Sequence, residues 1–213
     1  MIRSDDKGLL RGRVFRSENV ELDVSLAGSI PVRSSDNRAR AGMPDIDWLG
    51  EAGPRLQVNV ARAARDAKID FELPLRAVLS TDFSRVDYEG VIVVPDLTYQ
   101  NDSILGPRTR LKVWIGAHFA DRRFQELLYG VPASYATASR PAYEARSGYM
   151  GSRLLIQFSK RMNGRLRLIG AARLDYHRGA ANEASPLFRR ETTGSVAMAL
   201  IWSIMQSAAT VIE

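Results

Sequence analysis

The stretch NVELDVSLAGSI, residues 19–30, alternates apolar and polar side chains with a period of two residues. Successive side chains of an extended chain point to opposite faces, so this period predicts a strand with one apolar and one charged face. The apolar set is Val20, Leu22, Val24 and Leu26, and the polar set is Glu21, Asp23 and Ser25.

The same period recurs along the rest of the chain and predicts an all-β protein. Only FQELLYG, residues 124–130, favours a helix, and we expect no more than one short turn there. With further strands added, the total is about nine, several of them ten residues or longer. The clearest alternating segments are 56–60, 68–77, 110–119 and 165–177, and the further strands are expected at about 8–16, 86–100, 151–161 and 192–206.

The length of these strands favours a membrane barrel. Strands of soluble sandwiches have a mode of about five or six residues, whereas a tilted strand needs about 9 to 11 residues to cross a bilayer. The polar face carries charges of both signs, which suits a lumen where charges pair across strands. We therefore predict an antiparallel, transmembrane, up-and-down β-barrel. A soluble barrel with its apolar side inward produces the same alternation, and periodicity alone does not separate the two.

The connections support a barrel with two different ends. If the chain ends on the side of the short turns, the three longest connections, 33–47, 121–150 and 178–191, share the other, external end, with residues 1–7 beside them. An even number of strands then requires at least one more strand before residue 8, about ten in all. We expect one β-barrel domain over residues 1–213 that is truncated at its N-terminus and carries no signal peptide, because its start lacks an apolar core.

The composition excludes several classes of site. The chain has no cysteine, which excludes a disulfide framework, a thiolate metal site and a cysteine nucleophile. The net charge of +6 comes from basic residues spread through the strands, so we expect no nucleic-acid partner. His118 and His177 are the only histidines, and each is expected to be a hydrogen-bonding partner on a polar face. We expect no catalytic residues, no cofactor and no metal site.

Several long segments of the chain carry a resemblance to a known family. They are residues 8–48, 73–90, 118–131, 136–153 and 184–202. These segments resemble, in the same order, the MipA/OmpV family of Gram-negative outer-membrane proteins. The resemblance implies a transmembrane β-barrel in the cell outer membrane, in contact with membrane lipid. It also implies a non-enzymatic scaffold that links a lytic transglycosylase to a penicillin-binding protein at the peptidoglycan. Two alternatives stay open: a small solute channel, and a surface adhesin or receptor that acts through the external loops.

The polar faces of the predicted strands define a candidate lumen. We expect a charge network that fills the barrel and holds it shut, with a narrow, anion-favouring pore as the alternative. Its expected members are Lys68, Asp70, Glu72, Arg76, Arg110, Lys112, Arg153, Arg165, Arg167, Arg173 and Asp175.

The two longest connections define a candidate external surface. Acidic and basic residues of 33–47 are expected to pair with Arg122, Arg123, Arg140 and Glu144, and the longer loop is expected to form a plug, a cap or a recognition surface. Aromatic residues near strand ends predict a girdle at the membrane interfaces. The loop candidates are Asp36, Arg38, Asp45, Asp47, Arg122, Tyr129, Tyr135, Arg140, Tyr143 and Tyr149, and the girdle candidates are Trp48, Tyr88, Tyr99, Tyr149, Tyr176 and Trp202.

Overall fold

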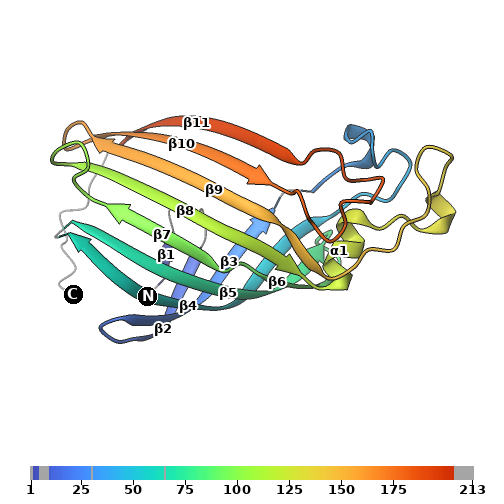
Figure 1. Ribbon diagram of the computed structural model, residues 1–213, viewed down its shortest axis with the longest axis horizontal. Helices are drawn as coiled ribbons and strands as arrows, with labels where there is room; N and C mark the ends of the chain where they lie inside the picture. Colours follow the sequence, from blue (N-terminus) through green and yellow to red (C-terminus); the bar gives the residue numbers. More distant parts are fainter. Residues whose placement is uncertain (1, 5–9, 30, 65, 204–213) are drawn as a thin grey trace.

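The computed structural model describes residues 2–4, 10–29, 31–64 and 66–203 as one large antiparallel sheet with short helices at one end (Figure 1). Aliphatic residues at every second position suit the pleated backbone of the strands. The strands are β1 (Ile2–Ser4), β2 (Leu10–Arg16), β3 (Val20–Ser29), β4 (Trp48–Ala64), β5 (Ala67–Thr81), β6 (Val86–Val93), β7 (Asp96–Asn101), β8 (Thr109–Ala120), β9 (Gly148–Arg161), β10 (Leu166–Tyr176) and β11 (Thr192–Trp202). The helices are η1 (Ser34–Asp36), α1 (Arg122–Tyr129) and η2 (Ala133–Tyr135).

The strands follow one another across the sheet in chain order. The path β1-β2-β3-β4-β5-β6-β8-β9-β10-β11 contains ten positions, because β6 and β7 share one position between β5 and β8. Every pairing is antiparallel, as in β3 with β4 and β9 with β10. The prediction of an all-β, up-and-down, barrel-like fold of about ten strands is confirmed.

The strand predicted over 86–100 is interrupted at Pro95. Proline has no backbone N–H and cannot donate to the neighbouring strand. Its carbonyl still accepts a hydrogen bond of 3.1 Å from the Ala117 N–H on β8. The register with β5 is the same on both sides of the break. The interruption therefore removes one hydrogen bond without moving any side chain to the other face.

The two faces of the sheet are inverted relative to a soluble β-protein. On β3, Val24 is 44% exposed, whereas Asp23 and Ser25 on either side are 1% and 0% exposed. A soluble barrel buries its apolar side, and the exposures on β3 are the opposite of that arrangement. The apolar side chains that face outward include Leu22, Val24, Leu26, Leu75, Leu97, Ile115, Ile156, Leu174, Val196, Met198 and Leu200.

The expectation of a single short helical turn after Arg123 is wrong, because residues 122–129 form the eight-residue helix α1. The Asp121 side chain caps it by accepting a 3.0 Å hydrogen bond from the Phe124 N–H. Phe124, Leu127 and Leu128 then share one side of the helix, since residues three and four apart are neighbours on its surface.

Residues near the start of the chain also differ from expectation. Residues 2–4 form β1 and pair with β2, so the expected external loop over 1–7 is wrong for this part. Residues 1 and 5–9 lie outside the described residues, as do 204–206 of the last predicted strand. No helix in the described part of the chain is long and apolar enough to cross a membrane.

Candidate functional site

A buried charge cluster centred on Arg55 ties three strands together on the inner face of the sheet. The guanidinium of Arg55 on β4 donates to Glu72 on β5 at 2.9 Å and to Asp23 on β3. Gln57 accepts a further hydrogen bond at 3.1 Å. Arg55 and Asp23 are each 1% exposed. Because two carboxylates offset the one buried guanidinium, the cluster satisfies the condition under which buried charge is tolerated.

Sequence reasoning missed Arg55. The alternation recognised in the sequence starts at residue 56, directly after Arg55, and β4 continues through Gly53 and Pro54. A Cβ on Gly53 would lie 2.1 Å from the Leu75 carbonyl oxygen, so glycine permits close contact between β4 and β5. The polar face of β3 offered a signal for Arg55. It carries Asp23, an acid that needs a basic partner on the neighbouring strand, and Arg55 lies directly opposite Asp23 in the pairing of β3 with β4.

Two further groups of the predicted lumen network lie beside this cluster. Arg76 on β5 donates to Glu51 on β4 at 3.1 Å. Towards the opposite end of β5, Lys68 lies 2.7 Å from Asp70, which also accepts from Asn59 at 2.9 Å. Asp70 and Arg76 are buried, so these charges face the inside of the sheet.

The predicted members on β8, β9 and β10 form a second group on the same face. Arg153 and Arg173 each donate to Asp175 at 2.6 Å, one to each carboxylate oxygen. The Lys112 ammonium lies 5.8 Å from the centre of the Trp114 ring, within the range of a cation–π contact. Charges of both signs therefore pair within and between strands, as a filled lumen requires.

The remaining predicted lumen residues lie at the end with the short turns. Arg110 at the start of β8 pairs with Asp102 in the turn before it. Arg167 lies near the start of β10 and lines a pocket there. Arg165 precedes β10 in the chain and is exposed.

At the other end, α1 packs against the inner face of the sheet (Figure 1). Phe124 joins Val78, Ile92 and Ala120 in a buried apolar cluster. Gly90 allows this approach, because its φ is +123° and a Cβ there would lie 2.2 Å from the Asp121 carboxylate. The longest connection therefore places a helix against the inside of the sheet.

The two longest connections meet through arginine and backbone carbonyls. Arg140 donates to the carbonyls of Ala39 at 3.1 Å and Ala41 at 2.8 Å, and Arg40 donates to the Leu127 carbonyl at 3.1 Å. Burial lowers the pKa of Arg40, and the nearby charge of Arg140 lowers it further. The guanidinium groups thus satisfy backbone carbonyls where the two loops meet, including that of the buried Ala39.

The cross-loop ion pairs expected from the sequence are replaced by these carbonyl contacts. Within the part of the two loops that the structure describes, Arg122 pairs with Glu144 at 2.9 Å, and both residues belong to the longer loop. Asp45 accepts a 2.7 Å hydrogen bond from the Ser34 N–H, which lowers the pKa of Asp45. The remaining candidates Asp36, Arg38 and Asp47 lie in the shorter of the two loops.

A buried amide pair joins the third long connection to the longest one, which in turn contacts residues 31–47 through Arg140 and Arg40. Asn182 is 1% exposed and Gln125 is fully buried, and Asn182 donates to the Gln125 side chain and to the Arg146 carbonyl. Tyr143 donates to Asn182 at 3.2 Å. Sequence reasoning missed both amides because their neighbours show no period. The three long connections therefore form one packed cap.

The tyrosines of the loops lie within this cap or at its border. The Tyr129 carbonyl accepts a 2.7 Å hydrogen bond from Ser185, and burial raises the pKa of the Tyr129 side chain. The Tyr135 carbonyl accepts from Arg140 at 2.9 Å. Tyr149 shares a 2.7 Å hydrogen bond with the Ser152 hydroxyl. All of these tyrosines are half-buried, and the contacts of Tyr129 and Tyr135 given above are made by their backbone carbonyls.

The girdle candidates lie at or near strand ends on the outer side. Trp48 and Tyr88 begin or flank strands at the cap end and are 43% and 44% exposed, and Trp202 ends β11 with 70% exposed. Trp48 also packs edge-on against Phe83, with ring centres 6.1 Å apart. Tyr99 differs, because it is half-buried and its hydroxyl accepts from Asn101.

His177 lies between the Met150 carbonyl and an aromatic ring. His177 shares a 2.8 Å hydrogen bond with the Met150 carbonyl and packs against Phe188. Within the described residues, no group of three or more histidine, aspartate or glutamate side chains is placed to hold a metal ion.

Comparison with known proteins supports the assignment that the fold suggests. Neither the search of curated proteins nor the search of solved structures finds a match. The family described as MltA-interacting protein MipA matches residues 1–204, which is nearly the whole chain. With its inverted, barrel-like antiparallel sheet and its packed cap, the chain belongs to the MltA-interacting protein MipA family.

Proposed function

We propose that this chain is an outer-membrane β-barrel protein of a Gram-negative cell. The observation that supports this most strongly is the inversion of the sheet, with aliphatic side chains outward and paired charges inward. Lipid suits such a surface, because outward apolar residues have no interior to fill and inward charges have partners. The aromatic residues at the strand ends fit the two membrane interfaces.

In this membrane the protein serves as a non-enzymatic scaffold. The family description names an interaction with MltA, and a lytic transglycosylase is therefore the first partner we assign. A penicillin-binding protein is the second, so that synthesis and hydrolysis of peptidoglycan are held together. The short turns face the periplasm in this arrangement, and the packed cap faces outward. Partner contacts are then expected at the turns or the rim.

The membrane arrangement is tested by folding the full chain into detergent micelles and comparing its gel mobility unheated and boiled. A folded barrel migrates differently from the boiled chain, whereas identical mobilities would contradict the barrel. The scaffold is tested separately by measuring the affinity of the folded, immobilised chain for purified lytic transglycosylase. An unrelated outer-membrane barrel in the same micelles is the control. Binding no tighter than this control overturns the scaffold and leaves the barrel intact.

A small solute channel is the second candidate, because a pocket of about 150 Å³ remains among arginines on the inner face. Planar-bilayer recordings discriminate between the two. Steady conductance steps that shrink when Arg110 and Arg167, which line this pocket, are neutralised support the channel, and a silent bilayer supports the filled lumen.

A further inference from the structure

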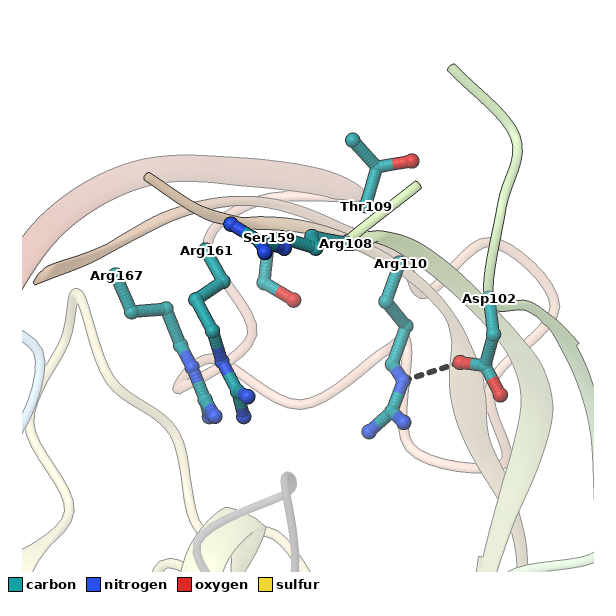
Figure 2. A pocket seen from close by; sticks show the side chains of 7 residues that line it. All are labelled: Asp102, Arg108, Thr109, Arg110, Ser159, Arg161 and Arg167. Atoms are coloured by element: carbon teal, nitrogen blue, oxygen red, sulfur yellow. Dashed lines mark hydrogen bonds and ion pairs between the residues drawn. The ribbon is translucent and has the colours of Figure 1, made fainter. Parts of the chain in front are cut away.

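A pocket of about 150 Å³ lies on the inner face at the end of the sheet with the short turns (Figure 2). Its walls come from three places in the chain: the turn before β8 with the start of that strand, the end of β9 and the start of β10. Figure 2 shows the guanidinium groups of Arg161 and Arg167 side by side and Arg110 across from them, all pointing to the same side of the sheet. The full lining is Asp102, Arg108, Thr109, Arg110, Ser159, Arg161 and Arg167.

The charges of this pocket do not balance. It contains four arginines and one carboxylate, Asp102, which pairs with Arg110 and also accepts from Gln100 at 2.9 Å. The side chains of Arg108, Arg161 and Arg167 form no ion pair or hydrogen bond with any described residue. This differs from the rest of the inner face, where Arg55, Arg76, Arg153 and Arg173 each have an acidic partner.

Two features of the pocket cost stability in the absence of a ligand. Arg161 on β9 and Arg167 on β10 are direct cross-strand partners. Like charges placed directly opposite each other destabilise a sheet. Arg108 has a backbone φ of +67°, in the left-handed region that a non-glycine residue rarely adopts. Its carbonyl accepts a 3.0 Å hydrogen bond from the Arg161 N–H, so this conformation fixes the turn against β9. Such local costs gather at ligand sites.

We propose that this arginine pocket binds a compact oxyanion group with two or more negative charges, of the phosphate or carboxylate type. A bound anion of this kind would offset the three unpaired guanidinium charges and relieve the repulsion between Arg161 and Arg167. The planar guanidinium presents parallel N–H donors that match two oxygens of one such group. The Ser159 hydroxyl lines the same pocket and supplies a neutral donor. The proposal concerns a site on this chain alone and does not depend on the scaffold.

The experiment measures binding of pyrophosphate and of citrate to the full chain in micelles by isothermal titration calorimetry, at matched ionic strength. Saturable binding is expected, and the tighter of the two probes identifies phosphate or carboxylate chemistry. Arg161→Gln and Arg167→Gln are each expected to weaken it about tenfold or more, as loss of a charged hydrogen bond implies. Arg167→Lys keeps the positive charge but loses the two parallel N–H donors of the guanidinium. Its affinity for the anion is expected to lie between that of the parent and that of Arg167→Gln.

The matched control is Arg165→Gln, which removes the same charge from an exposed residue two positions from Arg167 that does not line the pocket. Its affinity is expected to equal that of the parent. An equal loss of affinity in Arg165→Gln would show that the effect comes from net charge alone and would overturn the site. The absence of saturable binding by both probes would also overturn it. A second readout is the melting temperature without anion, which Arg167→Gln is expected to raise because the cross-strand repulsion is gone. Unheated gel mobility verifies that each variant is folded.

Discussion

Arg55 on β4 and Glu72 on β5 form a 2.9 Å ion pair on the inner face, with side chains only 1% and 6% exposed. Arg55→Leu removes the guanidinium that the buried carboxylates of Glu72 and Asp23 both contact. We expect the free energy of unfolding to fall by about 3–5 kcal/mol, the cost of breaking a buried ion pair. Urea unfolding in micelles, followed by tryptophan fluorescence, measures it.

The control for this change is Arg16→Leu, which removes a pair with Glu21 in which the arginine side chain is 61% exposed. Its effect is expected to stay below about 1 kcal/mol, because exposed ion pairs contribute little. Combining Arg55→Leu with Asp23→Asn and Glu72→Gln should recover part of the loss. Equal free energies of unfolding for Arg55→Leu and the parent would show that the cluster does not stabilise the fold.

The outward face of β8 provides a direct test of the surrounding solvent. Ile115 is 56% exposed and lies opposite Leu97 and Leu154 on the neighbouring strands. In lipid vesicles, Ile115→Arg is expected to destabilise the protein by about 2–4 kcal/mol, since a charge then enters the bilayer. Ile115→Val is the control and should change little. An arginine that is tolerated, or that makes the chain soluble without detergent, contradicts the outward apolar surface.

Gly90 determines whether α1 can approach the sheet. Gly90→Ala forces a side chain into a φ of +123° and towards Asp121, and we expect a loss of about 1–3 kcal/mol. Gly170→Ala is the matched control, since a Cβ there meets nothing within 4 Å. The melting temperature and the rate of trypsin cleavage at Arg122 and Arg123 report the change. Identical cleavage in both variants would show that the helix does not depend on Gly90.

The arginine contacts of the cap are tested by limited proteolysis. Arg140→Ala removes the donor to the carbonyls of the buried Ala39 and the exposed Ala41, and a buried acceptor left without a partner costs about 1–3 kcal/mol. We expect faster cleavage in residues 31–47 while the sheet remains folded. Arg38→Ala, an exposed change in the same loop, should leave cleavage unchanged. Unchanged cleavage in Arg140→Ala would mean that the loops are held by other contacts.

Asp82 in the turn between β5 and β6 predicts a pH dependence. Hydrogen bonds from the Ser84 hydroxyl, the Ser84 N–H and the Arg85 N–H lower its pKa from 3.8 to about 2. A depressed carboxyl pKa contributes stability that is complete above the ordinary value and is lost as the pH falls through the lowered one.

The melting temperatures of the parent and Asp82→Ala should therefore differ by a constant amount above pH 3.8 and converge towards about pH 2. Ser84→Ala removes the hydrogen bond that lowers the pKa of Asp82 most. In that background, the melting temperatures with and without Asp82→Ala should therefore converge at a higher pH. A difference that persists unchanged below pH 2 would assign the effect of Asp82 to something other than its charge.

Residues whose neighbours alternate regularly could be assigned to the correct face from the sequence. Asp70, Glu72 and Arg76 all point inward as predicted, because the period of two places every second side chain on one face. Arg55 escaped because glycine and proline precede it, and here both are accommodated within a long strand. Local propensity indicates a turn at that point, and pairing with β3 and β5 overrides it.

The cap could be predicted as a region but not as a set of contacts. The length of the connections identifies the three long loops. Alternate connections of an up-and-down barrel lie at the same end, so the sequence also predicts that these three loops lie together. Ordered loops of such length are usually functional. The partners of Arg140 are backbone carbonyls, which every residue carries, so no sequence pattern distinguishes Ala39 from its neighbours. The apolar spacing of Phe124, Leu127 and Leu128 was visible, yet it was too short to outweigh the surrounding loop signals.

The strands follow one another across the sheet in chain order, so each connection, short or long, joins strands that lie side by side or share a position in the sheet. The pairs joined by short turns can assemble as local hairpins. Arg140 and Ala39, by contrast, are 101 residues apart, and Arg40 and Leu127 are 87 apart. Contacts at such separation carry the largest loop-closure entropy unless the intervening strands have already brought them together. We therefore expect the contacts of the cap to form last, so that protection of the cap from protease reports the pairing of the strands between β3 and β9.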